Sequence, residues 1–284
     1  MNKILEINNV EKSFEGFKLD KINFSLNKGY IMGFIGPNGA GKTTTIRLIM
    51  NLLKKNSGDI KIFGMDNVAD EVTIKDRIGF VYEESYFYEH LTIKKMKEII
   101  SPFYSRWDDE KFDEYCDIFG LLPKKKIKDL SKGTKMKFSL AVALSHHAEL
   151  LILDEPTSGL DPVFRDKLMD ILREEIQDEN KSILFSTHIT SDLEKIADYI
   201  TFINDGKIVF SDQKDILLEN YKIVKGDTKI LSAEIKNQLL GVKENKFGFE
   251  ALCNVEKHSI FSQFDIVTEK PSLEQMMVYL SNKM

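Results

Sequence analysis

Hydrophobic positions follow two different patterns in the predicted strands of the chain. Where apolar and polar residues alternate, the pattern predicts strands with one buried and one solvated face, as in an antiparallel sheet. Short uninterrupted apolar runs predict strands that are buried on both faces. The alternating segments are 3–10, 18–26 and 59–63, and the continuous runs are 30–35, 150–153, 182–186 and 199–203. Helical stretches at roughly 163–178 and 190–197 separate the later runs, which predicts a parallel sheet with helices on both faces.

A block of helical character interrupts this pattern between about 84 and 148. Helices are expected at 91–100, 108–119 and 135–146. From about 222 the pattern restarts with short strands and helices and ends in a capped helix over 271–280. We therefore predict an α/β fold with four parts: a parallel-sheet core, an N-terminal antiparallel β subdomain, an inserted helical subdomain at about 84–148, and a small α+β C-terminal extension. The predicted division is a domain over 1–222 and an extension over 223–284.

Composition limits the classes of protein to which the chain can belong. The chain has 284 residues, 42% of them hydrophobic, and a net charge of −5 with a pI of about 5.7. A chain with this acidic balance offers no overall basic field, so no nucleic-acid partner is expected. No uncharged run approaches the roughly 18 to 20 apolar residues of a membrane span. The N-terminus lacks the apolar centre of a signal peptide, and Cys116 and Cys253 form no metal or redox spacing. These features favour a cytoplasmic location.

A glycine-rich segment between a predicted buried strand and a predicted helix carries the strongest chemical signal. It matches the phosphate-binding loop of nucleotide-hydrolysing proteins, G-x-x-x-x-G-K-[ST]. Because glycine has no side chain, the backbone of the loop can wrap closely around a triphosphate. The N–H groups at the start of the following helix then attract the anion. A lysine then reaches the outer phosphates and a hydroxyl can ligate Mg²⁺. The loop comprises Gly36, Pro37, Asn38, Gly39, Ala40, Gly41, Lys42, Thr43 and Thr44, with Thr43 as the Mg²⁺ ligand.

Three further polar side chains follow buried strands. Asp154 and Glu155 directly follow the run 150–153, and His188 follows the strand predicted at 182–186. Carboxyl ends of parallel strands meet at the ligand-binding edge of an open sheet. We interpret Asp154 as a Mg²⁺ ligand, Glu155 as the general base that polarises an attacking water, and His188 as a sensor of the γ-phosphate. The alternatives are an acidic turn in solvent and a structural histidine.

A second candidate anion site lies at Leu130–Thr134, before a strongly apolar helix. Ser131 offers a hydroxyl and Gly133 a bare backbone N–H at a helix N-terminus. Two phosphate-seeking sites in one chain suggest that one serves this chain's nucleotide and the other serves a partner's.

Taken in order, these motifs resemble the ATP-binding subunit of ATP-binding cassette (ABC) transporters, a P-loop NTPase family. The similarity covers residues 1–210 and also includes Ser57–Ile60 and the run Asp154–Asp161. The resemblance implies ATP and Mg²⁺ as ligands and a head-to-tail pair of cassettes, in which Ser131 and Gly133 contact the partner's γ-phosphate. It further implies that Asp161 links the two sites and that Phe14 stacks on adenine; the alternative for Phe14 is a buried residue at a strand end.

Two positions depart from the usual pattern of this family. Glu83 stands where the family has a Mg²⁺-contacting Gln. The segment Leu130–Thr134 is similar to the signature motif of the family, but it has Lys132 and Thr134 in place of Gly and Gln. At both positions the residue in this chain, Glu83 or Lys132, resembles what is found in the branch of the family that exports peptides, antibiotics and other drugs from Gram-positive bacteria. One hypothesis is that the partner's Lys132 offsets the charge of Glu83 near the phosphate. In the other, Lys132 points to solvent and Glu83 merely ligates the metal.

The leading interpretation is an ATPase that drives a separate integral-membrane permease. Binding to this permease would hold the subunit at the inner face of the membrane. The second cassette is either a copy of this chain or a different chain. One alternative is a soluble cassette ATPase acting on ribosomes or DNA, and another is a non-catalytic module that senses ATP. The aromatic segment 86–90 is the predicted docking site of the permease, unless it packs on its own subdomain.

Overall fold

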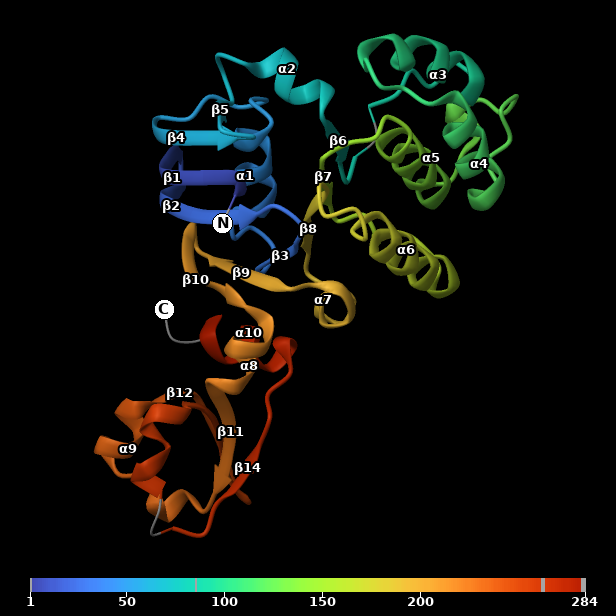
Figure 1. Ribbon diagram of the computed structural model, residues 1–284. Helices are drawn as coiled ribbons and strands as arrows, with labels where there is room; N and C mark the ends of the chain where they lie inside the picture. The colour runs from blue at the N-terminus through green and yellow to red at the C-terminus, as the bar shows by residue number, and fades with distance from the viewer. Residues whose placement is uncertain (1, 85, 262–263, 282–284) are drawn as a thin grey trace.

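The computed structural model describes residues 2–84, 86–261 and 264–281, and its elements form three sheets (Figure 1). The predicted N-terminal alternation forms a four-stranded antiparallel sheet of order β2-β1-β4-β5. Inward side chains pair across the strands, for example Leu5 with Ile62 and Ile7 with Phe24. The strands are β1 (Lys3–Phe14), β2 (Phe17–Asn27), β4 (Ser57–Ile62) and β5 (Met65–Asp66). The predicted antiparallel subdomain is confirmed.

The continuous apolar runs form a six-stranded sheet of order β10-β9-β3-β8-β7-β6. All of its strand pairs are parallel except β10 with β9. Every residue of β3, β7 and β8 is buried, which accounts for their uninterrupted apolar sequence. The strands are β3 (Ile31–Ile35), β6 (Ile78–Val81), β7 (Leu150–Asp154), β8 (Ser182–Thr187), β9 (Tyr199–Asn204) and β10 (Lys207–Gln213). The helices that directly precede or follow these strands are α1 (Lys42–Ile49), α2 (Glu71–Asp76), α6 (Pro162–Glu175), α7 (Thr190–Ile196) and α8 (Lys214–Glu219).

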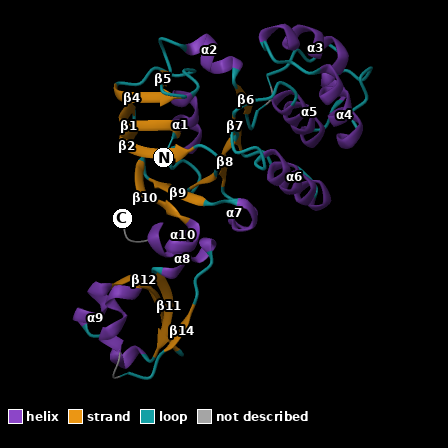
Figure 2. Ribbon diagram, viewed as in Figure 1, coloured by secondary structure: helices purple, strands orange, loops and turns teal. Residues whose placement is uncertain are grey.

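The inserted helical block stands apart from the antiparallel sheet in Figure 2. It contains α3 (Ile93–Ile100), α4 (Asp109–Phe119) and α5 (Lys132–Leu144), with short 3₁₀ turns at Ser101–Phe103 and Ile127–Asp129. Helix α5 begins three residues before the predicted start. Ser131 causes the difference because its Oγ accepts a hydrogen bond from the backbone N–H of Thr134 at 3.1 Å and so caps the helix earlier.

The C-terminal extension forms a third sheet, of order β12-β13-β11-β14. Its strands are β11 (Tyr221–Gly226), β12 (Leu239–Asn245), β13 (Gly248–Asn254) and β14 (Val267–Glu269). Its helices are α9 (Ala233–Gln238) and α10 (Leu273–Ser281), with 3₁₀ turns at Thr228–Ile230 and Val255–Phe261. The predicted boundary at 222/223 falls inside β11, and the division into two domains remains a prediction.

Helix α10 joins the extension to the parallel-sheet core. Ser272 and Gln275 cap it reciprocally, since each side chain accepts a hydrogen bond from the other's backbone N–H. Leu273 and Met276 are fully buried in the same hydrophobic cluster as Leu193 of α7. The backbone N–H of Leu273 also donates to Glu194 Oε1 at 2.8 Å. Among the described residues, no helix is long and apolar enough to cross a membrane.

Met276 tests whether α10 is held by burial in the shared core. We expect Met276→Ala to lower the free energy of unfolding by about 2–5 kcal/mol, because it removes a buried side chain and leaves a cavity. Val278→Ala on the same helix is the control, because Val278 is 41% exposed and its truncation is expected to cost no more than about 0.5 kcal/mol. Urea unfolding of both variants measures the difference. Equal losses would show that α10 is not anchored through Met276.

Candidate active site

The phosphate-binding loop leaves β3 and ends in α1. Gly41 has a φ of 110°, and a Cβ there would lie 2.5 Å from Leu19 Cδ2. A Cβ on Gly36 would lie 2.3 Å from the carbonyl oxygen of Ile203. The glycines are therefore required both by backbone conformation and by the close approach of neighbouring strands. The loop therefore forms a cradle at the positive end of α1, where an anion would be attracted.

Lys42 lies in this cradle with only 7% of its surface exposed. Its Nζ donates to the carbonyl oxygens of Gly36 at 2.8 Å and Pro37 at 3.3 Å, and it lies 3.9 Å from Glu155 Oε1. Burial lowers the pKa of the ammonium, and the negative charges of Glu155 and Asp154 oppose this effect. The ammonium is thus held over the loop, where the outer phosphates of a nucleotide would lie.

Asp154, the last residue of β7, fits the role of a cation ligand. It is fully buried, and neither carboxylate oxygen has a hydrogen-bond partner within the described part of the chain. Burial raises its pKa; the nearby hydroxyls of Ser186 and Thr43 lower it in part, although neither completes a well-formed hydrogen bond. Magnesium prefers carboxylate and hydroxyl oxygens of this kind, so Asp154 and Thr43 fit a Mg²⁺ ion.

Glu155 is held in a strained position beside Asp154. Its φ of 51° lies in the left-handed region, which non-glycine residues rarely adopt. Its backbone N–H donates to the carbonyl of Ser186 at 2.9 Å. Its Oε2 accepts from Thr187 Oγ1 at 3.3 Å and lies 2.9 Å from His188 Nδ1. The structure therefore joins Glu155, His188 and Lys42 in one network at the carboxyl edge of the sheet.

The second predicted anion site lies at the start of α5. Ser131 and Asp161 are both exposed N-cap residues, and Asp161 accepts from the backbone N–H of Phe164 at 2.9 Å, which lowers the pKa of its carboxyl. Gly133 packs on the loop before Asp161, since a Cβ on it would lie 2.6 Å from the carbonyl oxygen of Gly159. Within the described residues, no hydrogen bond or ion pair joins Ser131, Gly133 or Asp161 to the phosphate loop.

Comparisons with known proteins agree with this geometry. The sequence profile of the ABC transporter family matches residues 19–158. The bacitracin transport ATP-binding protein BcrA of Bacillus licheniformis is 34% identical over 241 residues, which cover 84% of this chain and 77% of that protein. The lantibiotic transport ATP-binding protein SrtF of Streptococcus pyogenes is 32% identical, over 75% of this chain and 92% of that protein. A solved ATP-binding subunit of an ABC transporter has a TM-score of 0.70 and 25% identity, over 76% of this chain and 92% of that one.

The chain is an ATP-binding subunit of the ABC transporter family. This confirms the resemblance, the fold class and the assignment as a Mg²⁺-dependent ATPase that were predicted from the motifs. A dimeric bacterial ABC transporter cassette shares the fold, with a TM-score of 0.66 and 23% identity over 74% of this chain and 98% of that one. The individual roles of the site residues remain proposals.

The network of this ABC subunit can perform hydrolysis by positioning and proton transfer. When bound, Mg²⁺ would neutralise charge on the phosphates, and Thr43 and Asp154 would hold it. Lys42 would hold the outer phosphates. Glu155 can polarise a water for attack, because Thr187 and His188 fix Oε2 and leave Oε1 facing Lys42. His188 is half exposed, so its ring can contact both Glu155 and solvent or ligand.

The two departures from the family pattern meet within one chain. Lys132 Nζ lies 3.6 Å from Glu83 Oε1 and donates to Ser158 Oγ at 3.1 Å. The pairing that was expected across an interface between cassettes is thus present in cis, and Lys132 does not simply point to solvent. Glu83 follows β6 at the same sheet edge as Asp154.

Phe14 lies at the end of β1 and is 45% exposed, which excludes the alternative of a buried strand-end residue. Lys12 Nζ lies 5.5 Å from its ring centre, and the Phe17 ring stacks at 6.5 Å. Phe17 also approaches the phosphate loop, because a Cβ on Gly41 would lie 3.1 Å from its Cζ. Phe17 was not identified from the sequence as a neighbour of the phosphate loop. Its position directly after the short turn that follows Phe14 could have indicated that the two rings lie together.

Helix α10 is a second feature that sequence reasoning missed. Together with the phosphate loop and residues 188–191, it lines an open cavity of about 450 Å³. Glu274, Met277 and Val278 come from α10 and share one face of the helix. The capping residues predict the helix, but no sequence signal placed it beside the nucleotide site.

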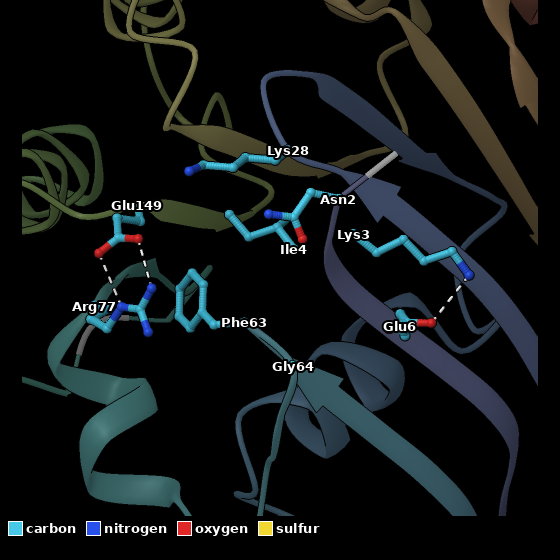
Figure 3. A pocket seen from close by; sticks show the side chains of 9 residues that line it. All are labelled: Asn2, Lys3, Ile4, Glu6, Lys28, Phe63, Gly64, Arg77 and Glu149. Carbon is cyan, nitrogen blue, oxygen red and sulfur yellow. Dashed lines mark hydrogen bonds and ion pairs between the residues drawn. The ribbon is translucent and has the colours of Figure 1, made fainter.

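Another pocket, of about 350 Å³, lies at the opposite edge of the parallel sheet (Figure 3). The Arg77 guanidinium donates twice to Glu149 and stacks on Phe63 at 3.8 Å. Glu149 directly precedes β7, whereas Asp154 ends that strand. Because Arg77 and Glu149 are already paired and lie at the end of the sheet opposite Asp154, we assign this pocket no part in nucleotide chemistry.

Lys42 and Glu155 should have separable roles. Lys42→Ala is expected to weaken nucleotide binding about ten-fold or more, since it removes a charged donor from the phosphates. Glu155→Gln should keep binding but reduce ATP turnover by a factor of about 10² or more, the usual scale for a positioned base. Fluorescent-nucleotide titration and steady-state ATPase assays measure the two effects. A Glu155→Gln variant with normal turnover would remove Glu155 from the mechanism.

Proposed function

We propose that this ABC subunit hydrolyses ATP to power the export of peptides, antibiotics or other amphipathic compounds through a separate integral-membrane permease. The carrying observation is the similarity to bacitracin and lantibiotic transport ATP-binding proteins, at 34% and 32% identity. Glu83 and Lys132, both similar to that export branch, support the same direction. The subunit would lie on the cytoplasmic face of the membrane through its permease.

The proposed catalytic residues are Glu155 and His188. The proposed nucleotide contacts in cis are Phe14 and the loop residues Gly36, Pro37, Asn38, Gly39, Ala40, Gly41, Lys42, Thr43 and Thr44. Thr43, Asp154 and Glu83 are proposed to serve Mg²⁺. Ser131, Gly133 and Asp161 are proposed to act on the site of a second cassette, because they are exposed or at the surface of α5 and α6 and have no contact with their own phosphate loop in the described chain. We propose residues 1–222 as the ABC-type domain and 223–284 as the extension.

The alternatives fit these observations less well. A ribosomal or DNA-acting cassette ATPase is not favoured by the acidic net charge of −5. A non-catalytic ATP sensor would have no need of a strained Glu155 that is fixed by two side chains beside Lys42.

Assembly gives the first test. If two copies of this chain enclose ATP, Glu155→Gln should dimerise on addition of ATP and separate with ADP, because it retains the nucleotide. Light scattering measures the mass. Ser131→Arg in the same background is expected to block the dimer and to keep nucleotide binding, since Ser131 is exposed and, among the described residues, has no hydrogen bond to its own phosphate loop. A monomer at every ATP concentration would mean that the second cassette is a different chain or that the proposal is wrong.

The permease contact gives the second test. Tyr88 is 59% exposed, whereas Phe87 packs on Phe138 of α5 with ring centres 4.6 Å apart. In cells that depend on this subunit for export, Tyr88→Asp should therefore raise the sensitivity to bacitracin-like peptides several-fold, as Lys42→Ala should. The isolated Tyr88→Asp chain, unlike Lys42→Ala, should keep its ATPase activity. Phe87→Asp should instead reduce soluble expression, because it places a charge in the subdomain core. Unchanged peptide sensitivity of the Tyr88→Asp and Lys42→Ala cells would contradict export of this class.

A further inference from the structure

Glu83 lies between two places that attract a carboxylate. On one side is the expected cation at Thr43 and Asp154. Glu83 is two residues beyond the end of β6, which pairs in parallel with β7 so that Val81 lies opposite Leu153, the residue before Asp154. Glu83 and Asp154 therefore leave the same edge of the sheet from neighbouring strands. On the other side is Lys132, whose Nζ is 3.6 Å from Glu83 Oε1.

Lys132 is fixed by more than this ion pair. It is the first residue of α5, directly after the N-cap Ser131. Its Nζ donates to Ser158 Oγ at 3.1 Å, and its aliphatic stem lies along Gly159, where a Cβ would be 3.5 Å from Lys132 Cδ. The ammonium is thus held at the loop that follows Glu155 and is directed towards the end of β6. Three segments meet here: the start of α5 with Lys132, the loop after Glu155 with Ser158, and the segment after β6 with Glu83.

One carboxylate cannot satisfy both attractions fully. Among the described residues, no three His, Cys, Asp or Glu side chains are arranged to hold a metal ion, so Glu83 does not already form such a group with Asp154 and Glu155. Both side chains of the ion pair are partly exposed, at 59% for Lys132 and 43% for Glu83, so Glu83 can move from one partner to the other without breaking a buried pair.

We propose that Lys132 is a positioning residue that draws Glu83 away from the cation at Thr43 and Asp154, so that metal binding and release of Lys132 from its own chain are coupled. This inference rests on the proposed function of the Mg²⁺ site. Coupling of this kind is reciprocal: whatever frees Glu83 from Lys132 strengthens the metal site, and metal binding to Glu83 frees Lys132 at the signature.

Binding of Mn²⁺ tests the coupling without using activity. Mn²⁺ replaces Mg²⁺ at oxygen sites, and the electron paramagnetic resonance signal of free Mn²⁺ gives its affinity for the full chain with a non-hydrolysable ATP analogue. Lys132→Ala should tighten Mn²⁺ binding about two- to five-fold, the range expected for loss of an exposed ion pair. Lys132→Arg should restore the original affinity. Lys135→Ala on the same helix is the matched control and should change nothing, because Lys135 pairs with Glu89 at 3.0 Å.

Glu83→Gln decides how Lys132 acts. It should weaken Mn²⁺ binding by itself, and in its background Lys132→Ala should have no further effect. An equal tightening in both backgrounds would mean that Lys132 acts through its general charge, and no tightening in either would mean that it does not position Glu83; both results overturn the inference. Failure of the unaltered chain to bind Mn²⁺ with the nucleotide analogue would instead overturn the proposed metal site and with it the proposed function.

Discussion

Three ionisable side chains, Lys42, Asp154 and Glu155, are buried together at the carboxyl edge of the parallel sheet, and the rest of the site depends on how their charges are balanced. Their exposed fractions are 7%, 0% and 6%. One cation faces two carboxylates, and Asp154 is left without a hydrogen-bond partner in the described chain. Buried charges are costly unless they are paired or coordinate a metal. A bound divalent cation would supply the missing positive charge, and so the arrangement accounts for why a Mg²⁺–nucleotide, rather than a bare nucleotide, is its natural ligand.

The fold keeps these charges in place through backbone conformations that most residues rarely adopt. Glu155 has a left-handed φ of 51° and Gly41 one of 110°. Neighbouring strands confine both residues: the Glu155 N–H donates to the carbonyl of Ser186 in β8, and a Cβ on Gly41 would lie 2.5 Å from Leu19 Cδ2 of β2. The uninterrupted apolar sequence of β3, β7 and β8 is therefore linked directly to function, because it fixes the strands whose ends carry the phosphate loop, the carboxylates and His188.

Much of this arrangement could be predicted from sequence because its signals are local. The loop 36–44, the carboxylates after β7 and His188 after β8 each follow a recognisable strand, and parallel strands end at one edge. The start of α5 was misplaced because the capping role of Ser131 was not weighed against the apolar pattern that begins later. Long-range contacts were not predictable: the cis pairing of Glu83 with Lys132 and the position of α10 beside the phosphate loop depend on how distant segments pack, which no local pattern in one sequence records.

We propose that Lys42, Asp154 and Glu155 form a site prepared for Mg²⁺ and ATP. A crystal structure of the Glu155→Gln variant with Mg²⁺–ATP tests it most directly. We expect Lys42 Nζ to leave the carbonyl oxygens of Gly36 and Pro37 for the outer phosphates, and the metal to contact Thr43 and both carboxylate oxygens of Asp154 or one of them. A nucleotide bound elsewhere, or a Lys42 that remains on Gly36 while Asp154 stays without a metal, would contradict it.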